Sequence, residues 1–100
     1  MAEVEITLAD GRRLGVREVD AGDMLDVIEA AGHAAGSDPW MHYALTICAV
    51  RSIDGVPVRL PASKDAMRDL ARRLGGDALD RVAVELSQAA RDEDLAVVKN

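Results

Sequence analysis

The stretch from Asp38 to Leu60, DPWMHYALTICAVRSIDGVPVRL, constrains the fold more than any other part of this chain. Asp38 can accept a hydrogen bond from a free amide at a helix start. Pro39 suits the first helical position, because its missing N–H costs nothing there. Between residues 40 and 50 the only strongly polar side chains are His42 and Thr46. The pattern predicts a helix over residues 38–50 that is apolar on nearly every side and lies at the centre of the domain.

The residues that follow predict a hairpin over 51–60. Asp54-Gly55 is a dipeptide that a two-residue hairpin turn prefers, because both central positions of that turn need a positive φ angle. Pro57 has no N–H for a ladder hydrogen bond, so the second strand should lie at the edge of a sheet.

Another hairpin is predicted over residues 1–19. Polar and apolar residues alternate from Glu3 to Leu8, and turn residues follow. Glu5 then faces Arg13 or Arg17 on the other strand, in a pair that contributes only a fraction of a kcal/mol.

Residues 20–32 predict a helix that begins at Asp20, a good N-cap, and ends at Gly32. A loop is expected from there to Ser37. The residues of this helix expected to face the core are Met24, Leu25, Ile28 and Ala31.

Two amphipathic helices are predicted over residues 63–74 and 77–92, with Ser63 and Asp77 as their N-caps. Residues 93–100 form a short apolar tail, which is either a strand added to a sheet edge or a mobile end. The residues of these two helices expected to face the core are Met67, Leu70, Ala71, Leu74, Leu79, Val82, Ala83, Leu86 and Ala90.

Together these elements predict a single domain over residues 1–100 of the α+β class, mostly helical, with about four helices and two hairpins. Trp40 and Tyr43 are the only aromatic residues, so the core must be aliphatic and light. We expect a homo-oligomer, because a partner subunit would add buried apolar area.

Charge and cysteine content limit the class of partner. The net charge is −6, and residues 1–50 carry nine acidic residues against three arginines. This excess of negative charge argues against non-specific electrostatic binding to nucleic acid or to an anionic membrane. Apolar runs are shorter than the about 20 residues that cross a membrane. Cys48 is the only cysteine, and no secretion signal begins the chain, so a reducing cytoplasm is the expected location.

No catalytic, metal or cofactor site can be assembled from the sequence. Cys48 and His42 lie about 120° apart around the predicted helix, so they do not face each other. His33 and His42 lack the further ligands that a zinc site requires. An acidic row along the first helix either receives a cation or a basic partner or is a solvated face. This row consists of Asp20, Asp23, Asp26 and Glu29.

Trp40 and Tyr43 share one face of the predicted central helix, with Met41 beside them. Aromatic residues together with methionine are typical of interface anchors. In a chain with so few aromatic residues they are equally suited to fill the core, so both interpretations stay open.

The order of these motifs resembles that of the small tail assembly chaperones encoded by long-tailed bacteriophages and prophages. The resemblance runs over about residues 4 to 90 and is strongest from Ile47 to Pro61, ICAVRSIDGVPVRLP. It implies a cytoplasmic, non-enzymatic protein that binds the long helical tape measure protein and keeps it soluble until the tail tube protein replaces it. The candidate partner-binding residues are Trp40, Met41, Tyr43, Asp54, Gly55, Val56 and Pro57.

Two other functions remain open. One is a structural virion component, such as a tail or neck connector. The other is a helix-turn-helix regulator, in which the helices 63–74 and 77–92 would bind DNA. The zero net charge of residues 51–100, and acidic residues in the second of these helices, disfavour that function. An antiparallel pair of helices explains the same pattern.

Overall fold

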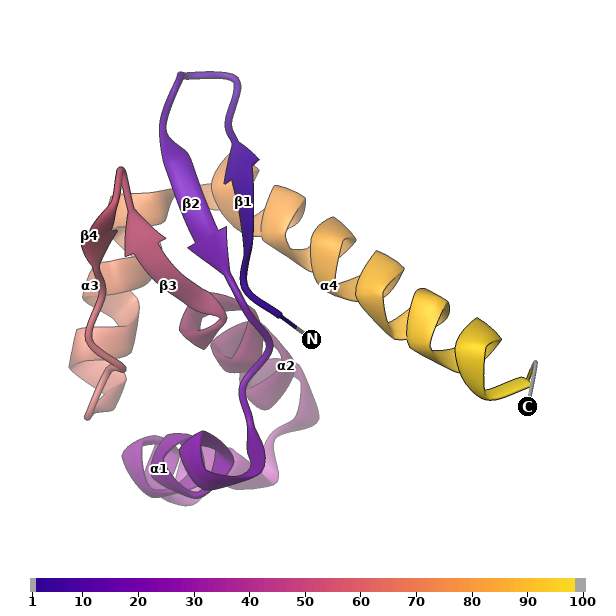
Figure 1. The fold of residues 1–100 in the computed structure, drawn as a ribbon. Helices are drawn as coiled ribbons and strands as arrows, with labels where there is room; N and C mark the ends of the chain where they lie inside the picture. The colour runs from indigo at the N-terminus through magenta and orange to yellow at the C-terminus, as the bar shows by residue number, and fades with distance from the viewer. Residues whose placement is uncertain (1, 99–100) are drawn as a thin grey trace.

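The computed structural model describes residues 2–98, with side chains placed through residue 92. Over these residues the chain forms four α-helices and one four-stranded antiparallel sheet (Figure 1). The α+β class, the four helices and both hairpins are therefore confirmed. The strands are β1 (Val4–Thr7), β2 (Arg13–Val16), β3 (Val50–Ile53) and β4 (Val56–Pro57). The helices are α1 (Ala21–Ala31), α2 (Asp38–Cys48), α3 (Lys64–Leu74) and α4 (Gly76–Val98), with a 3-10 helix, η1 (Gly32–Gly36), in place of the expected loop.

The two hairpins join into one sheet through β2 and β3. Leu14 lies opposite Ile53, and the register shifts at Gly15 and Val16. The tip of the second hairpin is tied to β2 as well. The backbone N–H of Asp54 donates to the carbonyl of Arg13 at 2.7 Å, and the Asp54 carboxylate accepts from the Arg13 N–H at 2.9 Å.

One face of the sheet carries the core, and α2 and α3 lie behind that face, whereas α1 lies beyond one end of the sheet (Figure 1). Leu14 and Val16 are fully buried there. On the opposite face Glu5 lies across from Gly15, and its carboxylate is 4.0 Å from the guanidinium of Arg13, one of the two predicted partners. The sheet is therefore half-buried, as the alternating pattern of β1 predicts.

Helix α2 begins and ends differently from the prediction. Ser37 is its N-cap, accepting from the amide of Trp40, and Asp38 lies in the first turn. The helix ends at Cys48, and Val50 belongs to β3. The expected burial on nearly every side is wrong. The end of α2 lies in the core, whereas His42 and Tyr43 are exposed.

Helix α1 faces the core with Ala31, as predicted, but not with Leu25 or Ile28. Val27 and Ala31 are buried, whereas Leu25 is 70% and Ile28 43% exposed. The reason lies outside the helix, because the carboxylate of Asp23 pairs with Arg51 of β3. Residues 23, 27 and 31 are spaced by four, so this ion pair and the buried stripe share one face.

Helix α4 is longer than predicted. It starts at Gly76, so Asp77 lies in the first turn and is not the cap. The backbone of residues 93–98, expected as an edge strand or a mobile end, continues the helix to Val98, and residues 99–100 lie outside the described part. Val82 is buried, but Ala90 is exposed, contrary to the prediction. The second half of α4 extends away from the domain (Figure 1).

Candidate partner-binding surface

Helix α3 is a wall shared by two hollows on the surface, and both of its ends are fixed. At its start the Ser63 hydroxyl accepts from the amide of Ala66 at 3.1 Å. At its end the guanidinium of Arg12, from the turn after β1, donates to the carbonyls of Arg73 and Leu74 at 2.9 and 2.8 Å. The four free carbonyls at a helix end need such donors.

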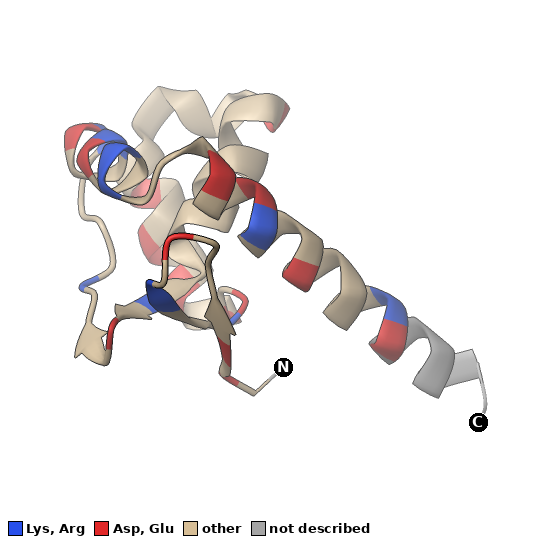
Figure 2. Ribbon diagram, turned by 90° about the horizontal axis from the view of Figure 1, so that it is seen from above, with Lys and Arg blue, Asp and Glu red and all other residues tan. Residues whose placement is uncertain are grey.

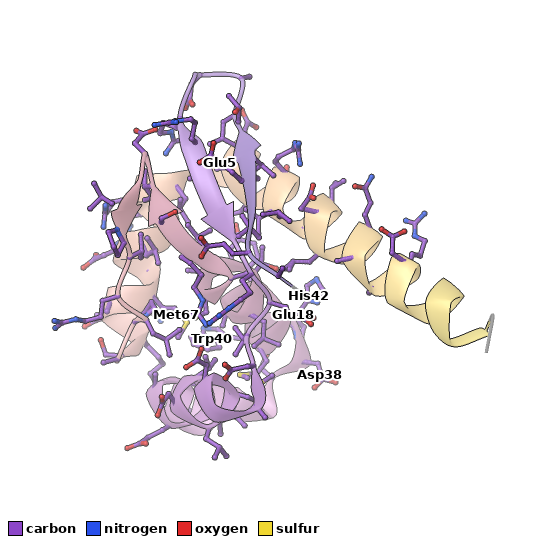
Figure 3. All side chains as sticks on the ribbon, viewed as in Figure 1. Glu5, Glu18, Asp38, Trp40, His42 and Met67 are labelled. Atoms are coloured by element: carbon purple, nitrogen blue, oxygen red, sulfur yellow. The ribbon has the colours of Figure 1, made fainter. Side chains whose placement is uncertain are left out.

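The first hollow, between α2 and α3, has a volume of about 120 Å³. We name it the aromatic hollow, because Trp40 and Tyr43 both line it. Trp40 is half-buried and lies near Met67 of α3 (Figure 3), whereas Tyr43 is 52% exposed. The other residues that line it are Ala44, Ile47, Met67, Arg68 and Ala71.

The two interpretations of the aromatic pair therefore apply to different residues. Trp40 packs against the core, while about half of the surface of Tyr43 is exposed to solvent. Met41 also packs against the core and does not line the aromatic hollow. The structure thus brings Trp40 and Tyr43 together and leaves Met41 apart.

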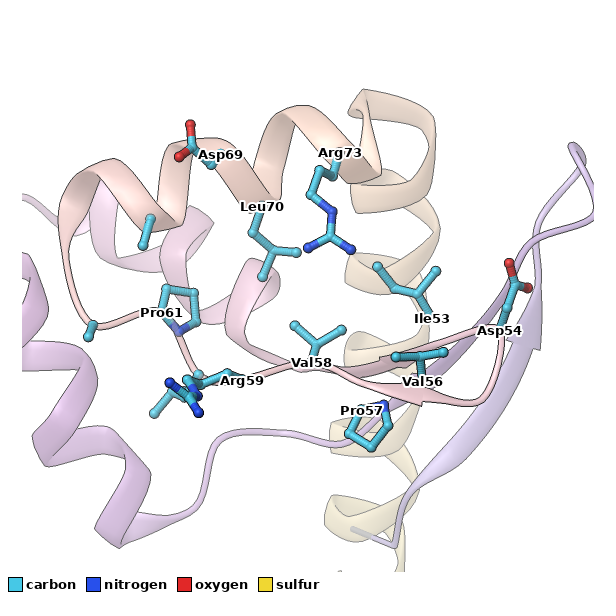
Figure 4. A pocket seen from close by; sticks show the side chains of 13 residues that line it. Ile53, Asp54, Val56, Pro57, Val58, Arg59, Pro61, Asp69, Leu70 and Arg73 are labelled. Carbon is cyan, nitrogen blue, oxygen red and sulfur yellow. The ribbon is translucent and has the colours of Figure 1, made fainter.

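The second hollow lies between α3 and β4, with a volume of about 650 Å³. Ile53, Val58 and Leu70 point into it, and Arg73 extends over it from α3 (Figure 4). We name it the arginine groove, because Arg59 and Arg73 both line it. The remaining residues along it are Asp54, Val56, Pro57, Leu60, Pro61, Ala62, Ala66 and Asp69.

The turn at Asp54-Gly55 forms one end of the arginine groove. Asp54 has φ +51° and Gly55 φ +81°, as the predicted two-residue turn requires. Val56 is on the core side of the sheet by register, opposite Ile53, yet it is 65% exposed. The groove exists because α3 does not cover this edge strand.

Two arginines and two acids line the arginine groove, but the arginines are not paired with these acids. The carboxylate of Asp54 accepts from the backbone N–H of Arg13. Among the described residues, neither Arg59 nor Arg73 has a carboxylate within ion-pair distance. Asp69, the acid beside them on α3, pairs with Arg72 at 3.4 Å. The groove therefore combines an apolar floor with two free cations.

The other arginines of α3 and α4 are largely engaged on their own helices. Arg68 pairs with Asp65 at 3.1 Å, and Arg81 pairs with Glu85 at 3.0 Å. Acidic and basic residues are interspersed along both helices (Figure 2). A row of free cations, which DNA phosphates would need, is not present on the described part of these helices.

Cys48 and part of the acidic row, considered above for catalysis and cation binding, contribute to the fold. Cys48 is buried at the end of α2, and its burial raises the pKa of the thiol to about 11. Two members of the acidic row are in use, since Asp20 caps α1 and Asp23 pairs with Arg51. No cluster of three or more metal-ligating side chains occurs among the described residues. None of the described helices combines the length and apolar character needed to span a membrane.

Sequence reasoning selected Trp40, Tyr43 and the turn from Asp54 to Pro57, but it missed α3 as their common neighbour. It also missed Arg59 and Arg73. A signal was present, because Val58, Arg59 and Leu60 continue the alternation of the edge strand toward α3.

Comparison with known proteins gives no match. No family model fits the chain, and searches of curated proteins and of solved structures find no significant similarity. A function must therefore be argued from the two hollows and from the sequence motifs.

Proposed function

We propose that this protein is a non-enzymatic tail assembly chaperone of a long-tailed phage or prophage. It binds the helical tape measure protein in the bacterial cytoplasm and keeps it soluble until the tail tube protein replaces it. The observation that supports this most is the exposed Tyr43 beside Trp40 over an apolar hollow between two helices. Such a hollow suits an apolar side chain on one face of an amphipathic helix.

The residues of the aromatic hollow fit a contact that must later be released. Aromatic residues give large contact area at low cost in conformational entropy. Met67, on the opposite wall, is unbranched and adapts to differently shaped side chains. A volume of about 120 Å³ admits a side chain and not a whole helix, so each contact should be weak and several copies would share a long client.

The test co-expresses the chain with the tape measure protein of the same genome and measures how much of the latter stays soluble and is captured. Tyr43→Lys places a charge at the rim of the aromatic hollow, so capture should fall by about tenfold or more. Val84→Lys is the matched control, because Val84 is also 52% exposed but lies on α4. It should capture as well as the unchanged chain.

Two results would overturn the proposal. One is equal capture by the Tyr43→Lys variant and the unchanged chain. The other is recovery of the chain in stoichiometric amount from finished particles, which would indicate a structural component.

A further inference from the structure

The arginine groove is the larger of the two hollows, and the proposed function does not use it. Its floor is apolar, and at its sides Arg59 and Arg73 have no ion-pair partner within the part of the chain that the structure describes. Two guanidinium groups next to apolar side chains are complementary to a segment in which carboxylates precede aliphatic residues. The unpaired guanidinium groups and the apolar floor are thus suited to an acidic and aliphatic peptide, although Asp54 and Asp69 also line the groove.

The chain itself contains such a segment in the last part of α4. Residues 92–98 read DEDLAVV, three acidic residues followed by four aliphatic ones. α4 has 23 residues, so it is about 34 Å long. From residue 87 to residue 92 its side chains are exposed, except for the partly exposed Ala89.

The segment cannot reach the groove of its own chain. β4 and α3 lie on one side of the domain, and the far end of α4 lies on the opposite side (Figure 1). A second copy is free of this restriction, because its groove can approach the projecting helix from outside.

We propose that the segment Asp92–Val98 of one copy docks in the arginine groove of a second copy. Arg59 and Arg73 pair with its carboxylates, and its aliphatic residues cover the floor. When each copy places its segment in the groove of the other, both segments and both grooves are occupied. The expected product is therefore a dimer. This inference does not depend on the proposed function, since Tyr43 lies outside the groove.

Sedimentation of the full chain over a range of concentrations tests the inference. Arg73→Glu should weaken self-association by about tenfold or more, because it replaces attraction by repulsion in the groove. Arg68→Glu is the matched control. It makes the same charge change elsewhere on α3, but neither Arg68 nor its partner Asp65 lines the groove. It should associate like the unchanged chain.

A charge exchange separates specific docking from general repulsion. One variant carries Arg59→Glu with Arg73→Glu, and the other carries Asp92→Lys, Glu93→Lys and Asp94→Lys. Each variant alone should be monomeric, with unchanged circular dichroism, and an equimolar mixture should form a mixed dimer. An unchanged chain that stays monomeric at all concentrations would overturn the proposal, and so would a mixture that stays monomeric.

Discussion

Cys48 shows how burial decides the role of a single residue. Its side chain is 1% exposed, at the end of α2. Removal from water disfavours the charged thiolate and raises the pKa of the thiol, against a smaller lowering by the nearby Arg51. Cys48 is therefore a core residue, and it is not suited to be a nucleophile at neutral pH.

The raised pKa predicts an alkaline loss of stability. Below about pH 9 the thiol is protonated in both the folded and the unfolded state, so Cys48 does not make the free energy of unfolding depend on pH. Between about pH 9 and 11 the unfolded chain releases this proton and the folded chain keeps it, which favours unfolding. The loss should reach about 2 to 3 kcal/mol. Urea titrations of the unchanged chain and of Cys48→Ala, at each pH, measure the difference. If the free energy of unfolding depends on pH equally in the two proteins, the folded chain does not raise the pKa of this thiol, which would contradict the prediction.

Helix α3 depends on a contact from a distant part of the chain. The turn after β1 holds Arg12 in place, because the Asp10 carboxylate accepts from its backbone N–H at 3.0 Å and from its Nε at 2.8 Å. The backbone hydrogen bond is the larger reason why the pKa of Asp10 lies below its usual value. Arg12 in turn donates to the last carbonyls of α3. This contact sets the position of the wall between the two hollows.

Arg12→Ala should lower the free energy of unfolding by about 1 to 2 kcal/mol, because two helix carbonyls lose charged donors at a partly exposed site. Arg12→Lys should lose less stability than Arg12→Ala. It should still be less stable than the unchanged chain, since one ammonium group cannot reproduce the paired N–H donors of a guanidinium. Chemical denaturation measures both. Arg13→Ala is the control. Within the described residues its side chain makes only an exposed pair with Glu5, so a change below about 0.5 kcal/mol is expected. An effect as large as that of Arg12→Ala would contradict this account.

The elements that the sequence predicted correctly are those set by local chemistry. Asp20 and Ser63 cap their helices through their own side chains, and Asp54-Gly55 adopts the positive φ angles that its turn requires. Trp40 and Tyr43 were selected for the same kind of reason, as rare aromatic residues on one helix face. No tertiary contact is needed to make these predictions.

The predictions that failed depend on distant residues. α1 has apolar side chains on more than one side, and the pair between Asp23 and Arg51 decides which of them faces the core. Leu25 was therefore misplaced. The arginine groove forms where β4 lies beside α3, and that position follows from the Arg12 contact and from the pairing of β2 with β3. Local patterns do not specify these contacts.

At the scale of the whole molecule, two electrostatic effects oppose each other when copies associate. The net charge of −6 repels a second copy over distances comparable with the domain. The proposed docking of carboxylates against Arg59 and Arg73 attracts it over a few ångströms. Salt screens these two effects at different concentrations, because the screening length is about 30 Å at 0.01 M and about 3 Å at 1 M.

Self-association should therefore be strongest at intermediate ionic strength. At about 0.01 M salt the repulsion between whole molecules persists. At about 0.15 M the screening length is about 8 Å, which suppresses that repulsion more than it weakens close ion pairs. At about 1 M the pairs weaken as well. Dissociation constants from sedimentation at the three concentrations measure this dependence. A steady rise of affinity up to about 1 M salt would show that apolar contact alone holds the copies together, and that the arginines contribute no attraction.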